Sequence, residues 1–260
     1  MTRLVRIFRL PSSIVVLTAC VVLAFFAARA DAAARIQLTV YAAASLTDVF
    51  PKIDSSQRYS FGGSNTLAAQ IQQGAPADVF ASANTTLPNQ LYAKGLCSKP
   101  LVFTRNTLVI VVPKANPAQI HGVYDLTRAG VKLDVAGPGV PVGSYTLQVL
   151  KNMNLSAAVT KNVVSQETDV REVLSKVALG EADAGFVYST DAKTVPGQVT
   201  AIKVPAWAQP KVQYGICVVA GGGSKGAAHV FVARVLSKTG QAKLIAAGFL
   251  PRAKPVLGKK

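Results

Sequence analysis

The stretch that decides the fold is residues 36–45, IQLTVYAAAS. Its first six residues alternate apolar and polar side chains, which is the two-residue period of a half-buried β-strand. The strand then opens into three alanines and a serine, and a weakly helical stretch follows at residues 46–53. A strand, a loop of small residues and a helix in this order begin a βαβ unit, so we expect the loop at the carboxyl edge of a sheet.

The same alternation continues along the chain. Further strands are predicted at residues 59–61, 78–81, 108–112, 131–136, 163–164, 184–188, 199–204 and 212–220. Further helices are predicted at residues 66–73, 87–94, 145–152 and 168–179, with one amphipathic helix over residues 230–247. This order predicts an α/β fold with parallel sheets that helices cover on both faces. With 260 residues, of which 50% are hydrophobic, the chain is long enough for two similar halves.

The amino terminus has the features of an export signal. Three arginines lie within the first nine residues, an apolar run follows at residues 14–28, and Ala30-Asp31-Ala32 offers small residues at the two positions that a signal peptidase reads. The apolar run is shorter than the ~20 residues of a membrane-spanning helix. A lipoprotein signal ending at Cys20 is the alternative, but the residues after Cys20 stay hydrophobic. We therefore predict a signal peptide over residues 1–32 and a periplasmic protein.

Charge and cysteine content limit the possible partners. The formal net charge is +16, and the chain stays strongly basic once the predicted signal peptide is removed. Its lysines and arginines are spread almost evenly, with no basic run interleaved with aromatic residues, so we expect no nucleic-acid partner. Cys97 and Cys217 remain after export and could form a disulfide or stay as two buried thiols. The sequence leaves both possibilities open.

Three loops share a composition that suits anion binding. Residues 42–45, 62–66 and 141–144 each follow a predicted strand, precede a predicted helix and are rich in glycine, alanine or serine. Such loops present backbone N–H groups at a helix amino terminus, where the helix dipole favours an anion, and serine hydroxyls add further donors. Three ordinary helix caps are the alternative explanation. Tyr188 ends a predicted strand, so its hydroxyl would point to the same edge of a sheet.

Catalytic motifs are absent from the sequence. It contains no HExxH, CxxC, GxGxxG or GxxxxGK[ST] pattern, and His121 and His229 lie in unrelated contexts. A secreted hydrolase that uses Ser45 or Ser64 would need a general base, and no candidate is evident. We therefore predict a binding protein rather than an enzyme, with no cofactor and no protein ligands to a metal.

Six blocks of sequence carry a resemblance to a known family. They are residues 40–47 (VYAAASLT), 61–68 (FGGSNTLA), 74–83 (GAPADVFASA), 137–145 (GPGVPVGSY), 169–171 (DVR) and 185–192 (GFVYSTDA). In the same order they resemble the periplasmic molybdate-binding proteins of ABC importers. The segment from Asp48 to Phe61 is shorter than in that family, which implies a trimmed first helix and second strand.

The resemblance implies a fold and a set of binding residues. The fold is two doubly wound α/β lobes joined by two crossover strands, as in periplasmic binding proteins, with residues 33–106 plus 215–260 in the first lobe and 107–214 in the second. Ser45 and Ser64 match serines that donate through hydroxyl and backbone N–H. Val142 and Val170 match backbone N–H donors, and Tyr188 matches a tyrosine whose hydroxyl donates.

The inferred donors favour a particular class of ligand. All five are neutral, which suits a fully ionised oxyanion such as molybdate, tungstate or sulfate better than monoprotonated phosphate, which needs an acceptor for its proton. The choice of molybdate among these anions comes from the resemblance alone. It implies a monomer that holds molybdenum through its oxo groups and delivers the anion to the membrane permease of an ABC importer. A binding protein for sulfate or another oxyanion is the alternative.

Overall fold

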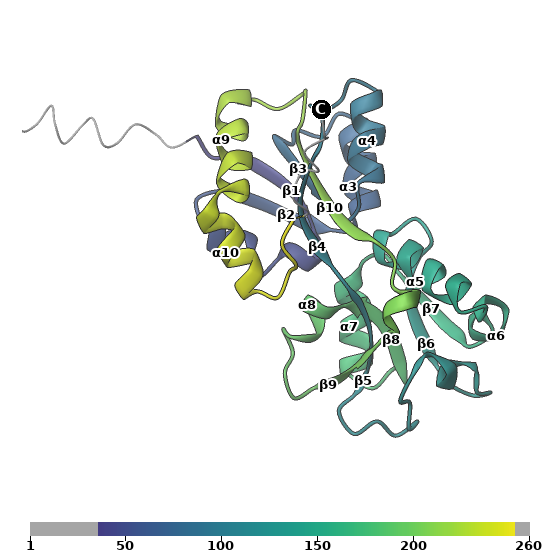
Figure 1. The fold of residues 1–260 in the computed structure, drawn as a ribbon. Helices are drawn as coiled ribbons and strands as arrows, with labels where there is room; N and C mark the ends of the chain where they lie inside the picture. Colours follow the sequence, from purple (N-terminus) through teal and green to yellow (C-terminus); the bar gives the residue numbers. More distant parts are fainter. Residues whose placement is uncertain (1–35, 253–260) are drawn as a thin grey trace, which may run out of the picture. The chain divides into compact units, whose positions relative to one another are not determined.

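The computed structural model describes residues 36–252, so the predicted signal peptide and Cys20 lie outside the described residues. Within this range the strands form two five-stranded sheets (Figure 1). The first has the order β2-β1-β3-β10-β4, with β1 Thr39–Ala43, β2 Arg58–Gly62, β3 Val79–Ser82, β4 Leu101–Asn106 and β10 Val212–Val218. The second has the order β7-β6-β8-β5-β9, with β5 Leu108–Pro113, β6 Leu133–Ala136, β7 Val163–Glu167, β8 Ala184–Tyr188 and β9 Val199–Lys203.

Helices cover both faces of the first sheet, and Figure 1 shows the sheet between two groups of them. Together with this sheet they are called the first lobe: η1 Ala44–Leu46, α2 Phe50–Ile53, α3 Ser64–Gln72, α4 Thr86–Ala93, α9 Lys225–Leu236 and α10 Lys238–Ala246. The face under α3 and α4 has its own apolar cluster around Phe80 and Leu91. The rings of Phe103 and Phe231 both pack against the ring of Phe50, and each has its centroid 5.9 Å from that of Phe50.

The second sheet is covered in the same way. Its helices, with the sheet, are called the second lobe: η2 Val123–Thr127, α5 Pro141–Asn152, α6 Ser156–Thr160, α7 Val170–Ala178, α8 Ser189–Ala192 and η3 Ala206–Ala208. A Cβ on Gly185 would lie 2.6 Å from the Val173 side chain, so α7 packs directly on β8. Asp134 of β6 pairs with Gly185 and shares its face of the sheet, whereas the next residue, Val135, lines a cavity with Leu147 and Leu150 of α5. Helices α5 and α7 therefore lie on opposite faces, as in a doubly wound sheet.

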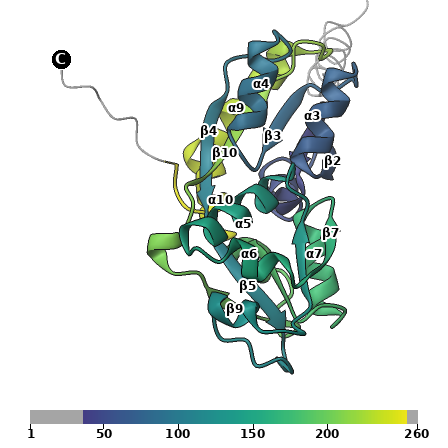
Figure 2. The same ribbon diagram turned by 90° about the vertical axis from the view of Figure 1, so that its right-hand side faces the viewer.

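The chain passes between the sheets twice. Strand β4 continues through Thr107 into β5, and Figure 2 shows the two strands as one nearly continuous ribbon. The return runs from the end of β9 to the start of β10. These passages agree with the expected pair of crossover segments, while the residue limits of the lobes, near Thr107 and Tyr214, stay a prediction.

Three details of the predicted fold are wrong. The sheets are mixed, because β10 runs antiparallel to β3 and β4, and β5 runs antiparallel to β8 and β9. Parallel neighbours are usually joined by a long helical connection, whereas β5 and β10 are reached through the segments that pass between the sheets. Strand β4 was not predicted, because this edge strand lacks a clean alternation of buried and exposed residues. The predicted helix 230–247 is two helices, α9 and α10, because Ser237 is extended (ψ 163°) and its hydroxyl caps α10.

The two described cysteines are both buried in the first lobe as free thiols. The side chains of Cys97 and Cys217 contact each other, and this hydrogen bond, with burial, raises the pKa of the Cys217 thiol. Within residues 36–252, none of the helices combines the length and the hydrophobicity that spanning a bilayer requires.

Candidate anion-binding site

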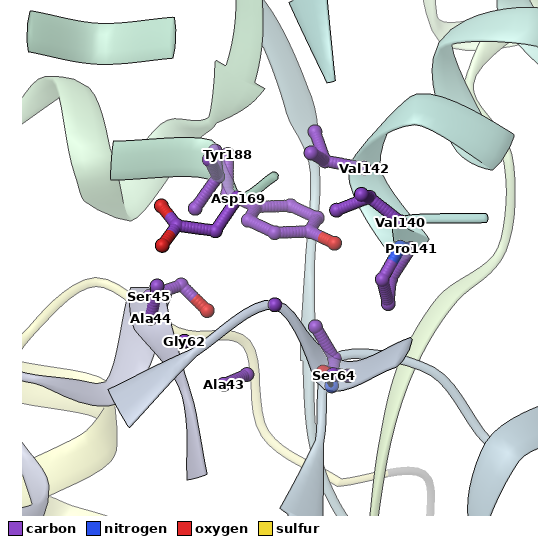
Figure 3. A pocket seen from close by; sticks show the side chains of 13 residues that line it. Ala43, Ala44, Ser45, Gly62, Ser64, Val140, Pro141, Val142, Asp169 and Tyr188 are labelled. Atoms are coloured by element: carbon purple, nitrogen blue, oxygen red, sulfur yellow. Dashed lines mark hydrogen bonds between the residues drawn. The ribbon is translucent and has the colours of Figure 1, made fainter. Parts of the chain in front are cut away.

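A cavity of about 210 Å³, counted with its opening to solvent, lies between the two lobes. Figure 3 shows side chains of both lobes converging on it. Its lining consists of Ala43, Ala44, Ser45, Gly62, Gly63, Ser64, Ala83, Val140, Pro141, Val142, Asp169, Val170 and Tyr188. The structure thus brings together all five residues predicted from the sequence, three from the second lobe and two from the first. That they bind an anion stays a prediction.

Helix amino termini supply backbone donors to this cavity. Helix α3 begins at Ser64 and α7 begins at Val170, and Val142 is the second residue of α5. The first N–H groups of a helix have no partner within the helix. Neither Gly63 nor Val140, the residues that precede α3 and α5, caps its helix with a side chain. The donors of these first turns are therefore available to a ligand.

Two glycines allow backbone segments beside the cavity to approach closely. A Cβ on Gly63 would lie 2.2 Å from the Thr168 carbonyl oxygen, which belongs to the other lobe. Gly143 is similarly constrained, since a Cβ there would lie 2.2 Å from the Gly137 carbonyl oxygen. Only glycine fits at both positions, which explains two of the glycines in the predicted loops.

Ser64 is held so that its hydroxyl proton is free. Its side chain is buried, and Oγ accepts a hydrogen bond from the Ala83 backbone N–H at 3.1 Å. Because this bond uses a lone pair of the oxygen, the hydroxyl can still donate to a ligand.

Ser45 is oriented by a hydrogen-bonded chain behind the cavity. Its Oγ lies 2.9 Å from the hydroxyl of Tyr214 on β10, and Asn106 Nδ2 donates to the same Tyr214 hydroxyl at 3.5 Å. The side-chain oxygen Oδ1 of Asn106 accepts from the Thr107 backbone N–H and the Ser189 hydroxyl, which fixes the orientation of the side-chain amide. Tyr214 can then donate to Ser45, leaving the Ser45 proton for the cavity. Asn106 and Tyr214 stand at the two passages between the sheets, and sequence analysis missed both because this contact joins residues 108 positions apart.

Tyr188, the last residue of β8, is the most informative residue of the site. It is 1% exposed, and its hydroxyl has no hydrogen-bond partner among residues 36–252. Figure 3 shows its ring between the serines of one lobe and Val140 and Val142 of the other. Burial raises its pKa well above the ordinary value, so it is a neutral donor. A buried hydroxyl without a partner is costly, and a ligand acceptor in the cavity would satisfy it.

The cavity wall also contains one carboxylate, which the predicted set of neutral donors did not include. Asp169 lies just before α7, and its Oδ1 accepts from the N–H groups of Arg171 and Glu172. It is the N-cap of that helix. Burial raises the pKa of Asp169. The wall is therefore rich in donors but not made of donors alone.

Histidine and basic side chains are absent from the described lining of the cavity. Neither His121 nor His229 is among the lining residues, and no lysine or arginine of the described chain lines it. The described residues also hold no group of three or more His, Cys, Asp or Glu side chains that could bind a metal ion. What the arrangement can do is hold a small anion by uncharged N–H and O–H groups.

Comparison with known proteins identifies close relatives. Residues 38–250 match the model of the bacterial extracellular solute-binding protein family. The chain is 38% identical over 222 residues to the molybdate-binding protein ModA of Mycobacterium tuberculosis, covering 82% of this chain and 84% of that protein. It is 35% identical to ModA of Haemophilus influenzae, covering 73% of this chain and 80% of that protein.

Solved structures share the fold at lower identity. The periplasmic molybdate-binding protein of Azotobacter vinelandii matches with a TM-score of 0.74 and 23% identity, over 84% of this chain and 100% of that one. The sulfate-binding protein SubI of Mycobacterium tuberculosis matches with a TM-score of 0.73 and 20% identity, over 83% and 87% of the two chains. These scores are nearly equal, so the fold does not separate the two anions.

Proposed function

Because the chain belongs to the bacterial extracellular solute-binding protein family, we propose that it binds molybdate in the cavity between its lobes. The partner that receives the anion is the membrane permease of an ABC importer. Tungstate, which carries the same charge on the same tetrahedral frame, is the second ligand. The protein is exported by its signal peptide and acts as a monomer without catalysing a reaction on the anion.

The observation that carries this proposal is the buried Tyr188 hydroxyl, which has no hydrogen-bond partner among the residues that the structure describes and borders the amino termini of α3, α5 and α7. A tetrahedral dianion supplies acceptors for the Tyr188 hydroxyl and for the uncapped first turns of α3 and α5. Sequence identity to the ModA relatives, rather than the shared fold, favours molybdate over sulfate.

Binding rather than turnover is favoured by the surroundings of the two serines. The partners of their hydroxyls are the Tyr214 hydroxyl and the Ala83 N–H, neither of which is a general base. A serine nucleophile needs a base within hydrogen-bond reach, usually a histidine.

Calorimetry and thermal unfolding with four anions test the proposal. Purified protein is titrated with molybdate, tungstate, sulfate and phosphate at one pH and ionic strength. Ligand at 100 times its Kd stabilises the folded state by about 2.7 kcal/mol, which raises Tm by roughly 5–10 °C in a chain of this size. We expect this rise with molybdate and tungstate. An equal rise with sulfate would replace the proposal by the general oxyanion alternative, and no heat with either metal oxyanion would end it.

A further inference from the structure

Arg171, the second residue of α7, makes contacts in both lobes. Its Nη2 lies 2.5 Å from Asp48 Oδ2 in the first lobe. Within the second lobe its Nε donates to Asp191 Oδ1 at 2.8 Å, and its Nη1 donates to the Thr194 hydroxyl at 3.2 Å. The planar guanidinium thus uses three nitrogens on three different partners, a geometry that lysine cannot reproduce.

The second-lobe contacts hold the guanidinium in place without Asp48. Asp191 is fully buried, and its other oxygen accepts from the Tyr188 backbone N–H at 3.3 Å. Burial alone would lower the pKa of Arg171, but the charges of Asp191 and Asp48 raise it, so the group stays cationic. Because the Arg171 side chain is already held in place, it loses little conformational entropy when Asp48 approaches. That loss of entropy is the usual cost of an exposed ion pair.

Asp48 follows the loop that carries Ser45, and half of its side chain is exposed. Of the four ion pairs among the described residues, the Arg171–Asp48 pair is the one that joins the two lobes. Close by, the Gly63 loop of the first lobe meets the Thr168 carbonyl of the second lobe. The ion pair therefore sits beside the cavity, where the two lobes touch.

We propose that the Asp48–Arg171 ion pair is a latch that holds the lobes closed over the bound anion, with Arg171 as its positioning residue. Arg171 connects three segments of the cavity wall: it follows Val170 directly, it reaches the Ser45 segment through Asp48, and it reaches Tyr188 through Asp191. Closing the latch thus brings the donors of both lobes together. The pair needs both lobes at contact distance, so opening the cleft breaks it.

The latch rests on the proposed function and acts on the release of the anion. A partly exposed pair is worth at most about a fivefold change in an equilibrium constant. Because the pair forms only on closure, we expect the change in the dissociation rate rather than in the association rate. The test exchanges bound radioactive molybdate against excess unlabelled molybdate, with the wild type and Asp48→Asn.

We expect Asp48→Asn to release molybdate up to about fivefold faster than the wild type at low salt. Glu181→Gln is the control, because it removes the same charge from an exposed site beyond the end of α7 opposite to Arg171. Removing a negative charge should by itself slow the release of an anion from the site. Faster release from Asp48→Asn would therefore indicate the loss of the latch. Added salt should speed release from the wild type and leave Asp48→Asn nearly unchanged, because salt screens the exposed pair.

Equal or slower release from Asp48→Asn would overturn the latch. If the wild type binds no molybdate, the proposed function fails, and small-angle X-ray scattering of the ligand-free proteins then decides on the latch. In that case a larger radius of gyration for Asp48→Asn than for the wild type and Glu181→Gln supports the latch, and equal radii overturn it.

Discussion

Replacing Tyr188 by phenylalanine should weaken anion binding without destabilising the free protein. The ring fills the same space, and the hydroxyl that is lost has no hydrogen-bond partner in the described part of the chain. A hydrogen bond from a hydroxyl to a charged acceptor contributes about 1.5–3 kcal/mol. We therefore expect Kd for molybdate to rise about tenfold to a hundredfold.

The free energy of unfolding should move in the opposite direction or not at all. An unsatisfied buried hydroxyl costs about 1–3 kcal/mol, and the phenylalanine ring avoids that cost where the cavity is closed and dry. Most substitutions in a protein core lower stability, so an affinity loss with unchanged or raised stability is a specific signature of a ligand-binding hydroxyl.

Calorimetry with molybdate and urea unfolding without ligand measure the two effects. Tyr124→Phe is the matched control, because Tyr124 is 61% exposed in η2 and should alter neither quantity. Unchanged affinity in Tyr188→Phe would remove this hydroxyl from the site. A stability loss of several kcal/mol would instead show that the hydroxyl has a partner in the folded protein, which contradicts its assignment as a donor kept for the ligand.

Four further substitutions follow from the same geometry. Ser64→Ala should raise Kd by about tenfold or more. It should also lower the free energy of unfolding by about 1–3 kcal/mol, because the Ala83 N–H loses its acceptor. An unchanged Kd in calorimetry would contradict the first expectation. Tyr214→Phe should weaken binding by about 0.5–1.5 kcal/mol through Ser45, and its effect should vanish in a Ser45→Ala background. Asp169→Asn keeps the helix cap and removes a negative charge from the wall, so binding at neutral pH should tighten by about 1 kcal/mol; weaker binding would mean that Asp169 accepts a proton of the ligand. Asp134, fully buried in β6, has its pKa raised to about 7 by burial and the neighbouring Glu167, so the folded state keeps a proton that the unfolded chain loses near pH 3.8. Stability should therefore fall as pH rises from about 4 to 7, by on the order of 4 kcal/mol at most, and pH-dependent urea unfolding of Asp134→Asn should lack this part of the fall.

Local pattern was sufficient for most of the elements. The alternation at residues 36–41 and the glycines that end helices at Gly74, Gly95 and Gly180 are properties of neighbouring residues, and all three glycines have the positive φ that such ends require. The local pattern failed where contacts between residues far apart in the chain determine the structure, as at the edge strand β4. It also failed at Ser237, where the hydrophobic period continues through a residue that ends one helix and caps the next.

The candidate site divides in the same way. Ser45, Ser64, Val142, Val170 and Tyr188 were predictable because each stands at a strand end or helix start within a recognisable block of sequence. Asp169 lies in one of these blocks, but its place in the cavity wall was not predicted, since only the fold brings the amino end of α7 to the cavity.

By itself, the sequence determined the alternation of strands and helices, the loops of small residues and the family resemblance. These features are encoded within windows of about ten residues, where side-chain period and backbone preference act. The tertiary structure alone decided that β10 and β5 run antiparallel to their neighbours, that Tyr214 and Asn106 stand behind Ser45, and that Arg171 reaches Asp48 123 positions away. Such contacts join segments far apart in the chain, and they result from the packing of the whole core rather than from any one segment.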